Sequence, residues 1–222
     1  MPINKIVSTA DAALEGVTRG SVILVGGFGG AGSPAALLEA LIRKSVYDLT
    51  IISNNAGVTG SAFGELISSG AVKRLICSFP RSAEPSPFPE LYEKGEIELE
   101  LVPQGTLSER IRAAGAGIGG FYTRTGVGTL LTADKECREI GGIEYVLEQP
   151  LRADVALIAG HLGDRWGNLT YSRSARNLGP TMAMAAKLTV AQVDRIVPLG
   201  GIDPEHVITP GIFVDRVVEI SQ

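Results

Sequence analysis

The chain has 222 residues, a length typical of one large domain or two small ones. Hydrophobic residues make up 45% and charged residues 20% of it, which is the composition of an ordinary globular protein with a sizeable core. The net charge of −4 argues against a nucleic-acid-binding protein. No shift in composition marks a linker, so we expect a single domain over residues 1–222.

The cysteines and the length of the apolar runs indicate the cellular compartment. Cys77 and Cys137 lie far apart with no ligand partner nearby, which excludes a zinc ribbon or a Cys-x-x-Cys redox motif and fits a reducing compartment. No apolar run approaches the roughly 18 residues that a membrane span needs. The first residues lack the apolar core of a signal peptide. We therefore expect a cytoplasmic protein with no membrane partner.

Helical periodicities and short apolar runs alternate along the chain, which predicts an α/β fold. The expected architecture is an open, mostly parallel sheet with helices on both faces. Residues 115–129 carry six glycines and are expected to form a long loop. The predicted helices cover residues 9–17, 34–44, 62–69, 88–94, 106–114 and 180–187. The predicted strands cover residues 22–25, 49–53, 74–78, 96–102, 145–147, 155–158 and 188–193.

A glycine-rich turn between the first strand and the second helix is the most informative segment. Glycines let the backbone adopt positive φ and approach a ligand closely, and the start of a helix favours anionic ligands. Ser33 is expected to cap that helix, with Pro34 at its first position. The candidate ligand-binding residues in the turn are Gly26, Gly27, Phe28, Gly29 and Gly30.

The same turn matches the spacing G-x-G-x-x-G from Gly27 to Gly32. A dinucleotide site also needs an acidic residue near the end of the next strand, where this chain has Ser53 and Asn54. No lysine follows Gly32, so the phosphate-loop pattern fails as well. A Rossmann-type nucleotide enzyme is therefore a disfavoured alternative.

Four predicted strands end in polar or glycine-rich clusters, at residues 26–32, 53–57, 78–81 and 103–105. Ligands of open α/β sheets bind at the carboxyl ends of the strands. Amide side chains such as Asn54, Asn55 and Gln104 can donate to a developing oxyanion without a proton shift. The alternative, which stays open, is that these clusters are ordinary turns.

No residue presents itself as a nucleophile. His161 and His206 have no serine or cysteine partner at a known spacing, and there is no G-x-S-x-G elbow. Cys77 ends a strand and is expected to be an inert buried thiol. The acidic residues lie mostly on faces expected to be solvated, and no metal-binding cluster is visible. The chain thus reads as a binding module or as one half of a shared active site.

Seven segments of the chain carry recognisable motifs, namely residues 26–34, 48–55, 102–112, 121–129, 164–171, 174–177 and 203–211. Together they resemble the alpha subunits of class I coenzyme A transferases. The similarity extends over almost the whole chain and implies that family's alpha-subunit fold. Within the family, residues 53–57 and 77–81 are most similar to the enzymes that act on 3-oxoadipate, in aromatic catabolism.

The resemblance implies a ping-pong mechanism through a glutamate that lies on a beta subunit, in a heterodimer or heterotetramer. No Glu-Asn-Gly motif occurs in this chain, so it would supply the facing wall of the site. Gln104 would orient that glutamate or stabilise its oxyanion, and Asn54 and Asn55 would line the pocket with residues 26–30. A CoA thioester is the expected substrate, with no further cofactor and no metal.

The expected acids are succinate and 3-oxoadipate, although acetoacetate- and acetate/butyrate-type transferases share the scaffold. A second carboxylate on the substrate needs a cation or a cluster of donors, because an unpaired buried charge is costly. Arg81 is the first candidate and Arg124 the second, since a guanidinium binds a carboxylate bidentately. Arg124 and Val127 depart from the family pattern, in which proline and tyrosine are common there. A catalytically idle protein of the same fold remains a third alternative.

Overall fold

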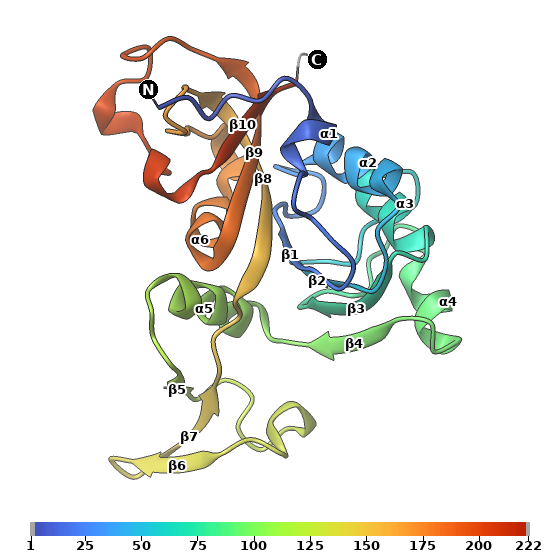
Figure 1. Ribbon diagram of the computed structural model, residues 1–222. Helices are drawn as coiled ribbons and strands as arrows, with labels where there is room; N and C mark the ends of the chain where they lie inside the picture. The colour runs from blue at the N-terminus through green and yellow to red at the C-terminus, as the bar shows by residue number, and fades with distance from the viewer. Residues whose placement is uncertain (1–2, 221–222) are drawn as a thin grey trace.

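The computed structural model describes residues 3–220 and contains a seven-stranded sheet with the order β10-β9-β8-β1-β2-β3-β4 (Figure 1). All neighbouring strands in it run parallel. The two strands at 22–25 and 49–52 are largely apolar, as expected for the centre of a sheet whose two faces are covered by helices. The strands are β1 (Val22–Val25), β2 (Leu49–Ile52), β3 (Val72–Cys77), β4 (Glu98–Leu101), β8 (Ala153–Gly163), β9 (Ala186–Ile196) and β10 (Arg216–Glu219).

The helices divide between the two faces of this sheet, and each face has its own buried apolar cluster. In Figure 1, α1, α2 and α3 lie on one side of the sheet, and α5 and α6 on the other. The predicted α/β fold with helices on both faces is therefore confirmed. The helices are α1 (Ala10–Ala13), α2 (Ala35–Lys44), α3 (Ala62–Ser68), α4 (Phe88–Glu93), α5 (Gln104–Gly115) and α6 (Gly179–Ala185). Short 3-10 turns cover η1 (Leu130–Thr132), η2 (Arg173–Arg176), η3 (Pro204–His206) and η4 (Gly211–Phe213).

The order of the strands reverses at β1, which has β2 on one side and β8 on the other. The chain first builds outward from β1 to β4 and then returns to build β8, β9 and β10 in the opposite direction. Such a switch point leaves a crevice beyond the carboxyl ends of the central strands. The glycine-rich turn that follows β1 stands at this crevice.

A second, smaller sheet corrects two predictions. Residues 115–129 are not a loop throughout, because α5 continues to Gly115 and residues 121–123 form a strand. The predicted strand at 145–147 does not join the parallel sheet and pairs antiparallel in the small one. Its strand order is β5-β7-β6, and in Figure 1 it projects from the body below α5. The strands are β5 (Phe121–Thr123), β6 (Cys137–Ile140) and β7 (Ile143–Glu148).

Buried ion pairs join the small sheet to the body. Glu148, at the end of β7, is 2% exposed and accepts from Lys135 Nζ at 2.6 Å. Arg110 of α5 lies 3.6 Å from the same carboxylate and donates to Gln149 O at 2.7 Å and to Glu100 Oε1 at 2.7 Å. Glu100 is therefore an exception to the solvated faces expected for most acidic residues, because Arg110 and Arg74 both pair with it.

The start of α2 also differs from the prediction. Ser33 makes no side-chain cap, and Pro34 is the cap residue rather than the first helical residue. The side-chain oxygen of Gln192, from β9, accepts the Leu37 N–H at 3.2 Å instead. A residue 155 positions away thus satisfies one of the free donors of this helix end.

The early residues of the chain close the β10 edge of the large sheet. Ile6 forms a parallel bridge with Val217, and Val217 N donates to Lys5 O at 2.8 Å. Lys5 Nζ donates to the carbonyl oxygens of Gly211 and Val214 at 2.7 and 2.6 Å. Within residues 3–220, no helix is both long and apolar enough to cross a bilayer.

Candidate functional site

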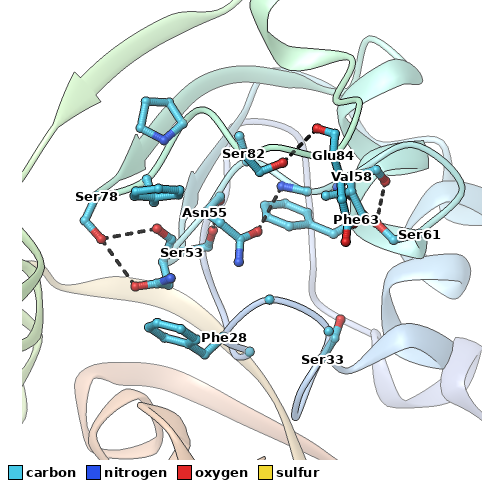
Figure 2. Close-up of a pocket in the computed structure, with 18 of the residues that line it drawn as sticks. Phe28, Ser33, Ser53, Asn55, Val58, Ser61, Phe63, Ser78, Ser82 and Glu84 are labelled. Atoms are coloured by element: carbon cyan, nitrogen blue, oxygen red, sulfur yellow. Dashed lines mark hydrogen bonds between the residues drawn. The ribbon is translucent and has the colours of Figure 1, made fainter.

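A pocket of about 800 Å³ lies beyond the carboxyl ends of β1, β2 and β3, beside the start of α5. It has two walls (Figure 2). Phe28 and Ser33, from the segment after β1, lie on one side, and Asn55, Ser78 and Ser82 lie on the other. Nine of the site residues predicted from the sequence border this pocket, namely Gly26, Gly27, Phe28, Gly29, Gly30, Asn54, Asn55, Arg81 and Gln104.

The glycine-rich wall is a tight hairpin-like turn. Phe28 N donates to Ala31 O at 3.0 Å and Ala31 N to Phe28 O at 3.2 Å, so Gly29 and Gly30 form the tip. Gly29 has a φ of +58°, which favours glycine, and a Cβ at either tip position would have no atom within 4 Å. Within residues 3–220 the N–H groups of Gly29 and Gly30 have no hydrogen-bond partner. The turn thus brings free backbone donors to the pocket.

Asn54 follows β2 and is buried, with 4% of its surface exposed. Its Oδ1 atom accepts from Gln104 Nε2 at 2.9 Å and from Ser78 Oγ at 3.3 Å. Its backbone oxygen accepts from Phe79 N at 3.0 Å. These contacts fix the orientation of the amide group, so its Nδ2 atom is left as the donor. Sequence reasoning placed Ser78 in a strand-end cluster but did not single it out.

Asn55 presents its amide in the same manner. Its Oδ1 atom accepts from Gly57 N at 2.9 Å, and the Ser53 hydroxyl donates to its backbone oxygen. Figure 2 shows the Asn55 side chain on the wall that faces Phe28. Within residues 3–220, these two adjacent amides therefore have their oxygens engaged and their nitrogens free to donate. This arrangement suits an anionic or strongly polarised oxygen atom.

Gln104 occupies a different element from the one predicted. It is the first residue of α5 rather than a strand-end residue, and it is exposed at the pocket. One of its N–H groups bonds to Asn54, 50 positions earlier in the chain. Gln104 therefore orients Asn54 and still has donor and acceptor capacity for a ligand.

Aromatic side chains give the pocket an apolar rim. Phe28 is 54% exposed and Phe79 is 62% exposed, from opposite walls. Large exposed aromatic rings in a concave site are typical of surfaces that a ligand or another chain covers. Phe79 belongs to the cluster at 78–81, but no local pattern indicated that its ring would be exposed.

Charge is sparse in the pocket. Among its lining residues in the described chain, Arg81 is the only cation and Glu84 the only carboxylate, and both are exposed. No histidine or cysteine borders it in that part of the chain. Burial raises the pKa of the neighbouring Cys77 thiol to about 12, which keeps it protonated and agrees with the inert thiol expected from the sequence. The pocket can bind and polarise a carbonyl or carboxylate, but offers little for nucleophilic attack.

The remaining candidates lie elsewhere. His161 of β8 bonds through Nδ1 to Asp194 Oδ2 at 2.8 Å, and His206 lies beside Asp203. Arg124 and Val127 follow β5 in the small sheet and do not line the pocket. Arg124 therefore has no support from this chain's geometry as a second carboxylate ligand. Residues 3–220 contain no cluster of side chains suited to a metal ion.

Known proteins are similar to this chain in both sequence and fold. A family model described as coenzyme A transferase matches residues 7–220. The A-type subunit of 3-oxoadipate CoA-transferase from Pseudomonas putida is 59% identical over 219 residues, which cover 99% of this chain and 95% of that protein. The A-type subunit of succinyl-CoA:3-ketoacid coenzyme A transferase from Xanthomonas campestris pv. campestris is 49% identical, over 96% of this chain and 88% of the relative.

Solved structures agree on the fold. Glutaconate coenzyme A-transferase from Acidaminococcus fermentans superimposes with a TM-score of 0.86 at 22% identity, over 98% of this chain and 76% of that one. An acyl-CoA transferase from E. coli O157:H7, solved as a thioester complex with CoA, gives 0.82 at 23% identity. The present chain spans about half of that protein, since 98% of it covers 47% of the other.

Proposed function

The chain belongs to the coenzyme A transferase family, and on that premise we propose that it is the alpha subunit of an enzyme that transfers CoA from succinyl-CoA to 3-oxoadipate. The observation that carries the proposal is the pocket itself. It combines free backbone donors, two oriented amides and an exposed glutamine, and among its described lining residues the only carboxylate is that of the exposed Glu84. A CoA transferase with a glutamate on its second subunit needs such a wall.

The chemistry divides between two chains. A glutamate of the partner chain attacks the thioester carbonyl, CoA leaves as thiolate, and a mixed anhydride forms. The thiolate then attacks the glutamyl carbonyl of the anhydride, which releases succinate and leaves a glutamyl-CoA thioester. The acceptor carboxylate repeats these steps in reverse and departs as its CoA thioester. Each attack puts negative charge on a carbonyl oxygen, and donors fixed before the reaction stabilise that charge most.

This chain supplies those donors. The Nδ2 groups of Asn54 and Asn55 and the backbone N–H groups of the glycine tip border the pocket from opposite walls. Gln104 holds Asn54 in orientation and is itself exposed to the ligand. The reaction needs no cofactor or metal besides the CoA thioester substrate.

The partner is a beta subunit, in a heterodimer or heterotetramer, and the expected compartment is the cytoplasm. The exposed rings of Phe28 and Phe79 fit a pocket that a second chain completes. Both cysteines are free thiols, which fits a reducing compartment.

The decisive experiment assays the chain alone and together with its beta subunit. We expect CoA transfer from succinyl-CoA only from the pair, and a covalent CoA adduct on the beta chain detected by mass spectrometry. Transfer by partner-free chain would refute the division of labour. An adduct on this chain would point to Glu84, the carboxylate in the pocket, and Glu84→Gln would then abolish it.

A second experiment tests the substrate. The reconstituted complex is offered 3-oxoadipate, acetoacetate and acetate as competing acceptors. A higher kcat/KM for acetoacetate or acetate would reassign the enzyme to one of the alternative transferase types. Arg81→Ala should weaken selection of the dicarboxylate, because a guanidinium holds a distal carboxylate. Unchanged selectivity in that variant would remove only the role of Arg81.

A further inference from the structure

One side chain outside the pocket fastens the glycine-rich turn in place. Asn177 follows η2, about 150 positions after the turn, and does not line the pocket. Its Oδ1 atom accepts from Gly27 N at 3.2 Å, and its Nδ2 atom donates to Ala31 O at 3.2 Å. The two ends of the turn, on either side of the Gly29–Gly30 tip, are thus bonded to one amide group.

The same amide is also tied to its own segment. Leu178 N donates to Oδ1 at 2.7 Å, and Nδ2 donates to Ala175 O at 2.8 Å. All four interactions require an acceptor and a donor at fixed places, which is the chemistry of asparagine and not of aspartate or leucine. The amide therefore links two loops that are distant in sequence.

The backbone of Asn177 is held in an unusual conformation. Its φ is +28° and its ψ is −123°, outside the regions that residues with a side chain normally adopt. Such strain persists only where surrounding contacts overdetermine it, and it is concentrated at functional sites. Here the contacts that hold it include the two side-chain bonds to the glycine-rich turn and the bonds within its own segment.

The two loops approach so closely that the glycine sequence is required. A Cβ at Gly32 would lie 2.2 Å from Ala175 O and 2.5 Å from Asn177 Nδ2. Gly32 also has a φ of +71°. On the other side, the Asn177 segment is anchored where the ring of Tyr171 packs against Gly179 and its hydroxyl bonds to Thr209 Oγ1 at 2.7 Å. The glycine-rich turn is thus bonded to a segment that is itself anchored by Tyr171.

We propose that Asn177 is a positioning residue that holds the glycine-rich turn so that its free backbone donors face the reacting carbonyl. The inference rests on the proposed function, because the turn matters only if a carbonyl is polarised beside it. Misplacing the turn should reduce stabilisation of the transition state more than binding of CoA, so kcat should fall more than KM rises.

The test compares three variants in the reconstituted two-subunit enzyme. Asn177→Gly removes the amide but tolerates the positive φ, so it separates the side-chain bonds from the backbone strain. Asn177→Asp keeps the acceptor and replaces the donor by an oxygen. Arg173→Gly is the matched control, because Arg173 lies in the same segment with a φ of +50° and is exposed.

We expect both Asn177 variants to lower kcat roughly 10- to 100-fold, with KM changed less than about threefold, as a small misplacement of a reacting group does. Arg173→Gly should leave kcat unchanged. A kcat within about threefold of wild type in Asn177→Gly, or an equal loss in Arg173→Gly, would overturn the proposal. Should Asn177→Gly fail to fold, Asn177→Asp decides by the same criterion.

A second readout does not depend on activity. Hydrogen exchange of residues 26–33, measured on the full chain, should accelerate in Asn177→Gly and stay at the wild-type rate in Arg173→Gly. Unchanged hydrogen exchange in Asn177→Gly would overturn the proposal that Asn177 holds the turn. If the wild-type complex transfers no CoA, the proposed function fails on its own, and the exchange measurement still decides whether Asn177 holds the turn.

Discussion

The two sheets of this molecule are stabilised in different ways. The large parallel sheet has apolar central strands covered on both faces, with core clusters that include Ile23, Leu24 and Ile51. The small antiparallel sheet has little core of its own. Among the described residues of its strands, Val146 is the one apolar side chain that is buried, and β6 is exposed throughout.

The small sheet is instead held at its base by charge. Glu148, Arg110 and Lys135 form a buried network where β7 returns to the body, and Arg110 also reaches Glu100. A buried network of this kind is costly to break, since removing one member leaves another charge without its partner. Apolar burial thus builds the sheet that carries the pocket, whereas ion pairs join the projecting sheet to the body.

The largest expected effect follows from breaking the network. Arg110→Leu should destabilise the protein by about 3–5 kcal/mol, because Glu148 would stay buried with Lys135 as its remaining partner. Arg112→Leu, on the same helix but in an exposed pair with Glu109, should leave the Tm close to wild type.

Chemical denaturation measures both variants. We propose that residues 1–222 unfold as one unit, so Arg110→Leu should show one transition at lower denaturant. Two separate transitions would instead mean that the small sheet is an independent domain. A Tm near wild type in Arg110→Leu would mean that the network does not hold the sheet.

Substitutions in the pocket, by comparison, should change the activity of the enzyme rather than the stability of the fold. Gln104→Ala is expected to lower kcat of the reconstituted complex on the order of 100- to 1000-fold, or ~3 kcal/mol, through loss of a donor and of the Asn54 orientation. The Tm should hardly change, because Gln104 is exposed at the start of α5. Ser108→Ala on the same helix is the control. A change in kcat below about fivefold would assign Gln104 to the helix start alone.

A matched pair of glycines compares the two sheets directly. Gly29, at the pocket, and Gly141, in the β6–β7 hairpin, have φ values of +58° and +61°, and a Cβ at either meets no atom within 4 Å. Valine at either position should cost a similar ~1–2 kcal/mol in backbone strain. Only Gly29→Val should also abolish transfer, because only that side chain enters the pocket.

Gly30→Val separates strain from obstruction at the same turn. Gly30 has no positive φ, so its valine variant should melt normally and still lose activity. Intact kcat and KM in Gly30→Val and Gly29→Val would show that the turn is only a connector. Loss of activity in Gly141→Val would show that the comparison of the two glycines does not isolate the pocket.

The smallest expected effect is a pH dependence at the junction of the two sheets. Partial burial raises the pKa of Glu100, but the hydrogen bonds and charges of Arg110 and Arg74 outweigh it, so the pKa lies below its ordinary value of 4.5. A lowered folded-state pKa stabilises the protein above pH 4.5, and this contribution disappears as the pH falls through the folded value.

Stability measured from pH 7 downward checks this sign. Glu100→Gln should be less stable than wild type at pH 7, and the difference should shrink below pH 4.5. Glu98→Gln, an exposed neighbour on β4, is the control. A difference that stays constant or grows on acidification would contradict the role of the two arginines.

The sequence predicted the large sheet well because burial leaves a pattern in it. The strand at 22–25 has the predicted bounds, and the glycine turn and both asparagines lie at the pocket as expected from strands that end at one edge. The strands at 121–123 and 137–140 escaped prediction, because partly or fully exposed strands show no apolar alternation. The strand at 216–219 also escaped prediction, because charged residues flank its two buried valines and break the apolar run.

The finer parts of the site depend on contacts between distant segments. The Gln104–Asn54 bond joins residues 50 positions apart, and the Asn177 clamp joins residues about 150 positions apart. Neither leaves a local spacing that sequence reasoning could use. The hydrogen bond from Leu37 N to Gln192 at the start of α2 likewise joins distant residues. It explains why Ser33 was wrongly expected to cap this helix.

The bridge between residues 5–7 and β10 limits when these early residues can gain their contacts. Lys5 bonds to residues 206 and 209 positions later, so these contacts close a loop that contains almost all of the described chain. Contacts at such separation carry the full entropy of loop closure and slow the final step. During synthesis, residues 5–7 cannot gain these partners until the ribosome has passed Val217, after all of the central strands have been made. Residues 5–7 are thus synthesised early but form these contacts late.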